Sequence, residues 1–145
     1  MGERADLTGL IERLEAATGP DRELDRAIMA LSYTWERRYI GGRCDPSCCP
    51  EGAHLDGVWV DPATDRWKTT ARNGFEFTAS LDAAMALVER VQPGWNCSAI
   101  NLKPDPCEAY VWRRSERCVR DVGGKGPTPA IALLIALLRT LETEQ

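Results

Sequence analysis

Apolar residues along the chain recur with two different spacings, which separate helical from extended segments. Over residues 7–17 they fall every three or four positions, on one face of a predicted helix. A Gly-Pro pair ends that helix, and a second stripe of the same spacing covers residues 24–31 and extends to Trp35. A third such stripe covers residues 81–91, before a Pro-Gly pair. The pattern therefore predicts three amphipathic helices, each with one face to bury.

Short runs rich in β-branched and aromatic residues between the helices predict strands. Residues 57–60 and 66–71 form one expected hairpin, joined by a turn of Asp, Pro and Thr residues. Residues 95–102 and 109–114 form a second, across a turn that contains two prolines. We expect the strands of the second hairpin to pair antiparallel.

The last predicted helix, residues 128–141, is apolar on every side. Thr128 is its expected N-cap and Pro129 its first residue, and nine apolar residues follow without a break. A helix of this kind is buried on several sides within its own chain or packs against another chain. Because a small domain seldom encloses a helix, we expect a homodimer contact through residues 128–141.

The order of elements predicts an α+β fold. Strands paired in hairpins, with helices between and after them, favour a layered α/β/α sandwich: a small antiparallel or mixed sheet with helices on its faces. A chain of 145 residues is long enough for one such domain, over residues 1–145. Residues 41–57, rich in Cys, Gly and Pro, are expected to form a loop insertion in it.

Composition excludes several classes of protein. Lys and Arg number 18 against 22 Asp and Glu, so the chain is acidic. The nearest approach to a basic patch is Arg113, Arg114, Arg117, Arg120 and Lys125, and it is interleaved with Glu108, Glu116 and Asp121. It therefore gives no strong signal for nucleic-acid binding. No apolar run is long enough for a membrane span, and the first residues do not resemble a secretory signal, so we expect a cytoplasmic protein without a membrane partner.

The most specific local motif is a group of three cysteines and a histidine in the predicted loop. Cys44, Cys48, Cys49 and His54 could bind a structural zinc ion, because zinc prefers four thiolate and imidazole ligands. The spacing is not C-x-x-C, however, and a disulfide within the loop or free thiols are alternatives that the sequence leaves open. His54 is the sole histidine, and no catalytic constellation is recognisable, so we expect a protein that is not an enzyme.

A second candidate site precedes the last helix. Residues 123–128, Gly-Gly-Lys-Gly-Pro-Thr, could hold a phosphate on the amides of a helix N-terminus, with Lys125 beside it, although a plain strand-to-helix loop is favoured. The Lys is followed by Gly, so the P-loop pattern is not met. Tryptophans such as Trp112 could stack on a planar ligand, but packing in the core is the more usual role.

Three blocks of the sequence together resemble a family of small phage and prophage proteins, those with the phage ABA sandwich domain. The blocks are residues 10–28, 77–95 and 128–141, and the likeness depends on GPDRELD, SLDAA, PGW and TPA within them. The resemblance implies an α/β/α sandwich encoded by a tailed phage or prophage, present in the host cytoplasm, in a family with no assigned activity. The loop that contains Cys44 and His54 is not part of the family pattern.

Two functions follow from these observations. The first is a non-enzymatic phage accessory protein that binds a small ligand; one version sequesters a nucleotide signal of host defence. Its candidate residues are Trp112 for the base, and Arg120, Lys125 and the helix start at Thr128 for phosphate. The alternative is a zinc-stabilised module that binds a host protein through the loop of Cys44, Cys48, Cys49 and His54.

The zinc alternative makes a direct prediction. If the four side chains bind zinc, native mass spectrometry of protein purified without chelator will show an excess of one zinc per chain, and a strong chelator will lower the melting temperature. An unmodified mass together with an unchanged melting temperature would exclude the metal.

Overall fold

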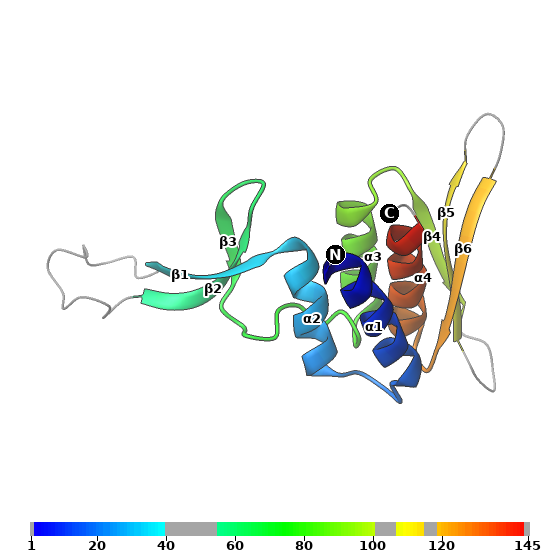
Figure 1. Ribbon diagram of the computed structural model, residues 1–145, viewed down its shortest axis with the longest axis horizontal. Helices are drawn as coiled ribbons and strands as arrows, with labels where there is room; N and C mark the ends of the chain where they lie inside the picture. The colour runs from blue at the N-terminus through cyan, green and yellow to red at the C-terminus, as the bar shows by residue number, and fades with distance from the viewer. Residues whose placement is uncertain (1, 40–54, 101–106, 115–118, 144–145) are drawn as a thin grey trace, which may run out of the picture. The chain divides into compact units, whose positions relative to one another are not determined.

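The computed structural model describes residues 2–39, 55–100, 107–114 and 119–143 (Figure 1). The chain divides into two compact units: residues 1–25 together with 76–145, and residues 26–75. The helices are α1 (Gly2–Ala16), α2 (Arg22–Ser32), α3 (Leu81–Val91) and α4 (Pro129–Thr143). The strands are β1 (Thr34–Tyr39), β2 (Leu55–Asp61), β3 (Arg66–Thr69), β4 (Asn96–Ile100), β5 (Cys107–Arg114) and β6 (Val119–Gly126). Helices that pack on antiparallel sheets confirm the α+β class.

The sheet of the first unit has the strand order β4-β5-β6. β4 and β5 form the hairpin that the sequence predicts, in register from Asn96 opposite Trp112 to Ile100 opposite Glu108. One face of β5 is buried through Cys107, Ala109 and Val111, whereas the alternate residues on the other face are partly exposed. The sheet therefore has one core face and one face in contact with solvent.

β6 occupies residues for which the sequence favoured a loop. That prediction is wrong for Gly123–Gly126, which continue the strand opposite Cys107–Tyr110. Glycine is normally unfavourable in a strand because it has no side chain to pack. Here the missing side chain is required, because α4 lies directly against the strand. A Cβ on Gly124 would clash with the carbonyl oxygen of Ala132 and lie 2.7 Å from the nitrogen of Ala136.

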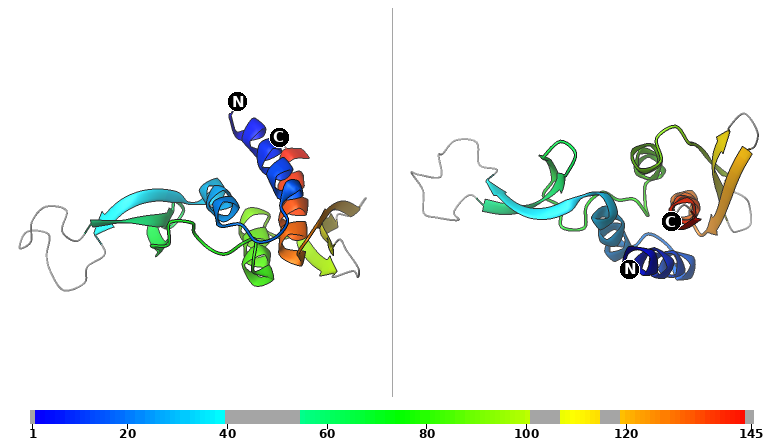
Figure 2. Two further views of the ribbon diagram at one scale, coloured as in Figure 1. Left: turned by 90° about the horizontal axis from the view of Figure 1, so that it is seen from below. Right: turned by 45° about the horizontal axis from the view of Figure 1, so that its top comes forward.

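α4 is the centre of the first unit. In the right-hand view of Figure 2 the helix is seen nearly end-on, with the sheet on one side and α1 and α3 on the other. Residues 130–138 are all 2% exposed or less. Each buried Leu or Ile there contributes about 1.5–3 kcal/mol. The sequence left open whether the last helix is buried within its own chain or packs against another chain. The structure shows burial within the chain, so residues 130–138 leave no exposed face for the predicted dimer contact. The oligomeric state itself stays a prediction.

Two helices form the outer layer of this unit. α1 contributes Leu7, Leu10, Ile11 and Leu14, and α3 contributes Ala84, Leu87 and Val88. The residues of α1 are the apolar stripe that the sequence predicts. In α3 the buried face differs in part from the prediction, which included Met85: Leu87 is buried, whereas Met85 is 43% exposed. Within the described part of this unit, α1, α3 and α4 thus lie on the same side of the β4-β5-β6 sheet (Figure 2). A buried polar link joins α4 to the end of α3: Gln92 Nε2 donates to Thr140 Oγ1 at 2.9 Å, and Thr140 donates to the carbonyl of Leu137 at 2.6 Å.

A buried carboxylate fixes the start of α2 in the first unit. Asp25 is fully buried, and its Oδ1 accepts from the backbone nitrogen of Thr78 at 2.7 Å and from the Thr78 hydroxyl at 2.8 Å. Arg22 pairs with the other oxygen at 2.8 Å. Asp21 caps the helix by accepting from the amides of Glu23 and Leu24. Burial of the Asp25 charge is therefore offset by hydrogen bonds and an ion pair.

The second unit is a meander of β1, β2 and β3. β2 and β3 are the predicted hairpin, but β1 was not foreseen: the stripe that assigned Trp35 to a helix is interrupted, because α2 ends at Ser32. Trp35 instead lies opposite Trp59, and the two indole rings meet edge to face at 5.3 Å. Cross-strand aromatic pairs stabilise a sheet, which explains why the tertiary contact overrides the helical spacing.

Substitution Gly124→Ala tests the contact between α4 and β6. The added methyl group meets backbone atoms of α4, which have no rotamer to change, so we expect a loss of about 1–3 kcal/mol in the free energy of unfolding. The control is Gly9→Ala in α1, where a Cβ has nothing within 4 Å. There we expect a gain of about 0.5–1 kcal/mol, because alanine is the better helix former. Urea unfolding of both variants measures the difference, and an equal stability for the two would refute the contact.

An exposed ion-pair cluster in the second unit predicts a pH effect. Hydrogen bonds from Thr34 and then Arg38 hold the pKa of Glu36 below its ordinary value. Because the folded pKa is the lower one, the contribution is fully present above the unfolded pKa and is lost as the pH falls through the folded value. We expect Thr34→Val to raise the pKa of Glu36 in an NMR titration. An unchanged midpoint would show that Thr34 does not hold the carboxylate.

Candidate functional site

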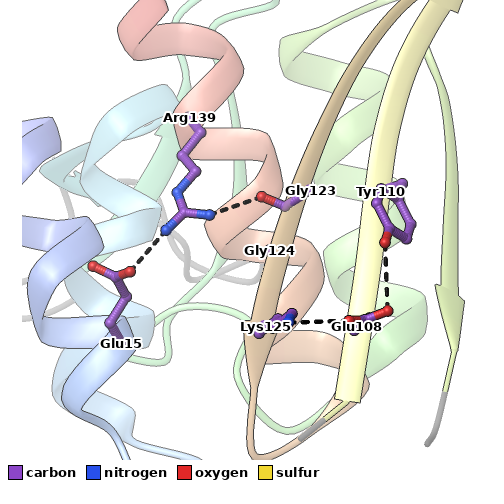
Figure 3. Close-up of a pocket in the computed structure, with 7 residues that line it drawn as sticks. All are labelled: Glu15, Glu108, Tyr110, Gly123, Gly124, Lys125 and Arg139. Carbon is purple, nitrogen blue, oxygen red and sulfur yellow. Dashed lines mark hydrogen bonds and ion pairs between the residues drawn. The ribbon is translucent and has the colours of Figure 1, made fainter.

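A pocket of about 310 Å³ lies in the first unit, where α1, α4, β5 and β6 meet (Figure 3). Its lining consists of side chains from both helices, side chains from the solvent-facing side of β5 and β6, and the backbone of two glycines. These residues are Glu15, Glu108, Tyr110, Gly123, Gly124, Lys125 and Arg139. The volume is at the lower end of the range for small-molecule sites, about 300–1,000 Å³.

Arg139 forms the wall of the pocket on the helix side. Its Nη1 donates to the carbonyl of Gly123 at 2.9 Å, and its Nη2 pairs with Glu15 at 2.7 Å. β6 is at the end of the strand order, so this carbonyl belongs to a sheet edge. The guanidinium therefore satisfies an edge group and joins α4 to α1, while its own side chain stays 39% exposed. Two of its bonds fix its position, and a guanidinium has five donors in all.

Glu108 and Lys125 form the opposite wall. They are directly opposite one another on β5 and β6, and Lys125 Nζ lies 3.3 Å from Glu108 Oε1. The Tyr110 hydroxyl donates to the other carboxylate oxygen at 3.4 Å. Glu108 is 22% exposed, whereas Lys125 is 67% exposed, so the ammonium lies at the mouth of the pocket.

Gly123 and Gly124 are adjacent on β6 and therefore face opposite sides of the sheet. Gly124 faces α4, and Gly123 faces the side of the sheet that carries Tyr110. A Cβ on Gly123 would lie 2.9 Å from Cε1 of the Tyr110 ring. Tyr110 therefore lies against the backbone of Gly123. At Gly123 and Gly124 the lining of the pocket is backbone alone (Figure 3). A ligand could contact that backbone closely.

The charges of the pocket balance, but its ion pairs are weak. Lys125 and Arg139 face Glu108 and Glu15, and three of these four side chains are between 39% and 67% exposed. Exposed ion pairs of this kind contribute about 0–1 kcal/mol, because water screens them. An anionic ligand can therefore replace a carboxylate on either cation at small cost. The pocket can exchange its internal partners for a ligand.

The predicted ligand residues are dispersed along the sheet. Lys125 lines the pocket. Trp112 is on β5 opposite Asp121, four positions from Glu108 and about 13 Å from it along the strand. Arg120 is on β6 opposite Arg113, about 17 Å along the strand from Lys125.

Thr128 caps α4 instead of lining the pocket. Its hydroxyl accepts from the amide of Ile131 at 3.1 Å, as the sequence predicts for an N-cap. Its carbonyl accepts from Ala132 at 3.0 Å. The hydroxyl is therefore already bonded to the first turn of the helix.

Sequence reasoning missed Arg139, Tyr110 and both carboxylates of the pocket. Arg139 had a detectable signal, because it is the first charged residue after the apolar run of the last helix. A lone arginine there must reach a polar partner. Glu15 and Glu108 had none, because their proximity depends on how α1 and β5 are placed around α4.

The predicted zinc ligands Cys44, Cys48, Cys49 and His54 lie outside the described residues, so that hypothesis stays a prediction. Among the residues that the structure does describe, no group of three or more His, Cys, Asp or Glu side chains could hold a metal ion. Cys97 is a free thiol on β4, and Cys107 is buried on β5. Burial raises the pKa of Cys97 above its ordinary value, which disfavours the reactive thiolate.

Comparisons with protein-family models, curated proteins and solved structures each find no match to this chain. The resemblance to the phage ABA sandwich family therefore stays a prediction from the sequence. Within the described ranges, no helix has both the length and the apolar character needed to cross a bilayer.

Proposed function

We propose that this chain is a non-enzymatic binding protein whose pocket takes a small anionic ligand with a planar group, a nucleotide being the ligand class that fits best. The observation that carries the proposal is the convergence of Lys125 and Arg139 on one pocket beside the Tyr110 ring. Cations recognise phosphate, and an aromatic ring stacks on a base. The glycine backbone between them allows close approach of the ligand.

The pocket has no net charge, but an anion can still bind if it replaces the carboxylates that pair with Lys125 and Arg139 in the free protein. In the free protein, Glu108 and Glu15 occupy the cations. A phosphate group would take over Lys125 from Glu108 and use the remaining donors of Arg139, whose bond to Gly123 can persist. A divalent anion forms stronger charge-assisted hydrogen bonds than an exposed carboxylate, so the exchange favours binding.

The resemblance to phage proteins supports one biological version of this function. A phage accessory protein that sequesters a nucleotide signal of host defence needs affinity and no chemistry. The proposal therefore includes phage origin and the host cytoplasm as its setting, as the sequence predicts.

Isothermal titration calorimetry with cyclic nucleotides, cyclic dinucleotides and ADP-ribose tests the proposal. We expect heat with at least one of these probes, weaker affinity at higher salt, and a loss of about ten- to a hundredfold in affinity for Lys125→Gln, because one charged hydrogen bond contributes about 1.5–3 kcal/mol. Lys68→Gln on β3 makes the same change of charge outside this pocket and should bind normally.

Glu108→Gln gives the sharper comparison. If the ligand is anionic, removing the competing carboxylate should raise its affinity. A cationic ligand would instead lose affinity in this variant. No heat with any of the probes, or a Lys125→Gln protein that binds as the parent does, would refute nucleotide binding in this pocket.

A further inference from the structure

A second surface with chemistry of its own lies on the β1-β2-β3 sheet of the other unit. Trp35 and Arg37 are two residues apart on β1 and therefore project from the same face. They are opposite Trp59 and Gly57 of β2, which share that face. The guanidinium of Arg72 lies over the Trp35 ring, 5.8 Å from its centroid. We call this surface, defined by Trp35, Arg37, Trp59 and Arg72, the Trp35 face.

The indole at the centre of the Trp35 face is held in place and stays partly exposed. Trp59 contacts it edge to face, and Gly57 leaves the space that its ring fills, since a Cβ on Gly57 would clash with Trp35. Trp59 is buried, and its Nε1 donates to the carbonyl of Arg72 at 3.0 Å, which also fixes the backbone of that arginine. Trp35 itself stays 37% exposed. A fixed and exposed indole costs little entropy when a ligand stacks on it.

The arginines of this face are exposed and have no carboxylate partner among the described residues. Arg37 and Arg72 are both exposed. Arg38, whose side chain alternates to the opposite face, differs: it pairs with Glu36 at 3.0 Å and with Asp65 at 2.6 Å. Glu36 and Asp65 thus pair with Arg38 on the opposite face, whereas no ion pair holds Arg37 or Arg72 among the described residues. Arg66 and Lys68 on β3 are exposed as well.

The charge of the chain is also unequal between its parts. Residues 26–75 carry seven Lys or Arg and six Asp or Glu, a formal charge of +1, whereas the remainder carries 11 and 16, a formal charge of −5. The acidic total that argues against nucleic acid for the whole chain therefore does not apply to this unit. The unit is close to neutral, so its affinity for an anionic partner depends on the local arginines of the Trp35 face.

We propose that the Trp35 face binds single-stranded nucleic acid, with Trp35 stacked on a base and Arg37 and Arg72 paired with phosphates on either side. Arg37 is about 7 Å along the strand from Trp35. The exposed guanidinium of Arg72, which lies over the ring in the free protein, would move aside to meet a phosphate when a base stacks on the indole. This combination of an aromatic platform and flanking cations on an open antiparallel sheet suits unpaired bases, which expose their faces for stacking. A duplex hides those faces, and an acidic peptide has no bases, so neither would use the indole.

The test is fluorescence anisotropy with labelled 12-residue oligo-dT and oligo-U, read together with tryptophan quenching. We expect binding to both, quenching on saturation, and a log–log dependence of affinity on salt. Arg37→Gln should reduce that salt slope by about 0.7, the share of one phosphate contact on a single strand. Trp35→Phe should weaken binding and reduce the quenching, while Arg13→Gln on the exposed side of α1 should change neither.

Several results would overturn the proposal. Absence of binding at low salt would do so, as would an Arg37→Gln variant with the parent affinity and slope. Equal competition by poly-glutamate without quenching would identify an acidic peptide surface instead. Lys125→Gln separates this inference from the proposed function, because loss of that pocket cation should leave oligonucleotide binding unchanged. Circular dichroism of Trp35→Phe checks that its sheet is intact, and if the sheet is disrupted, the salt slope of Arg37→Gln decides the question.

Discussion

The close approach of α4 to β6 is the constraint on which the first unit depends. The backbone of the helix lies against the backbone of the strand at Gly124, where no side chain separates them, and Gly126 makes the same contact with Ile131 and Ala132. This approach places the apolar helix deep enough for α1 and α3 to cover its far side. It explains why a small domain can enclose a helix completely, which the length of the chain alone makes unexpected.

The candidate pocket is a consequence of the same contact. Because α4 lies so close to β6, Arg139 reaches the edge carbonyl of Gly123, and the neighbouring α1 contributes Glu15. Because β6 has glycine at 123, the ring of Tyr110 can lie against the strand on its other side. A glycine pair that weakens the strand locally thus creates both a packed core face and a backbone-lined binding face. The packing of the core thus depends on Gly124, and the shape of the proposed binding pocket depends on its neighbour Gly123.

The pocket of Lys125 and Arg139 and the Trp35 face hold their cations in different ways. In the pocket, Lys125 and Arg139 are held by carboxylates, which position them and can be displaced. On the Trp35 face, Arg37 and Arg72 have no such partners among the described residues, and two indoles position Arg72 instead, through the Trp35 ring face and a hydrogen bond from Trp59 to the Arg72 carbonyl. The first arrangement suits a small ligand that replaces a carboxylate. The second suits a polyanion, whose affinity depends on the number of phosphates it brings.

The sequence by itself determined the helices, the two hairpins and the α+β class, because periodicity and turn residues act within a few positions of the chain. It also identified Lys125 and the cap at Thr128. Only the tertiary structure decided that Gly123–Gly126 form a strand, that Trp35 leaves the helix to meet Trp59, and that Arg139 and Glu15 share a pocket with Lys125. In each of these cases the deciding contact joins residues far apart in the chain. Local patterns record the preferences of a segment, and they do not contain the partner against which that segment will pack.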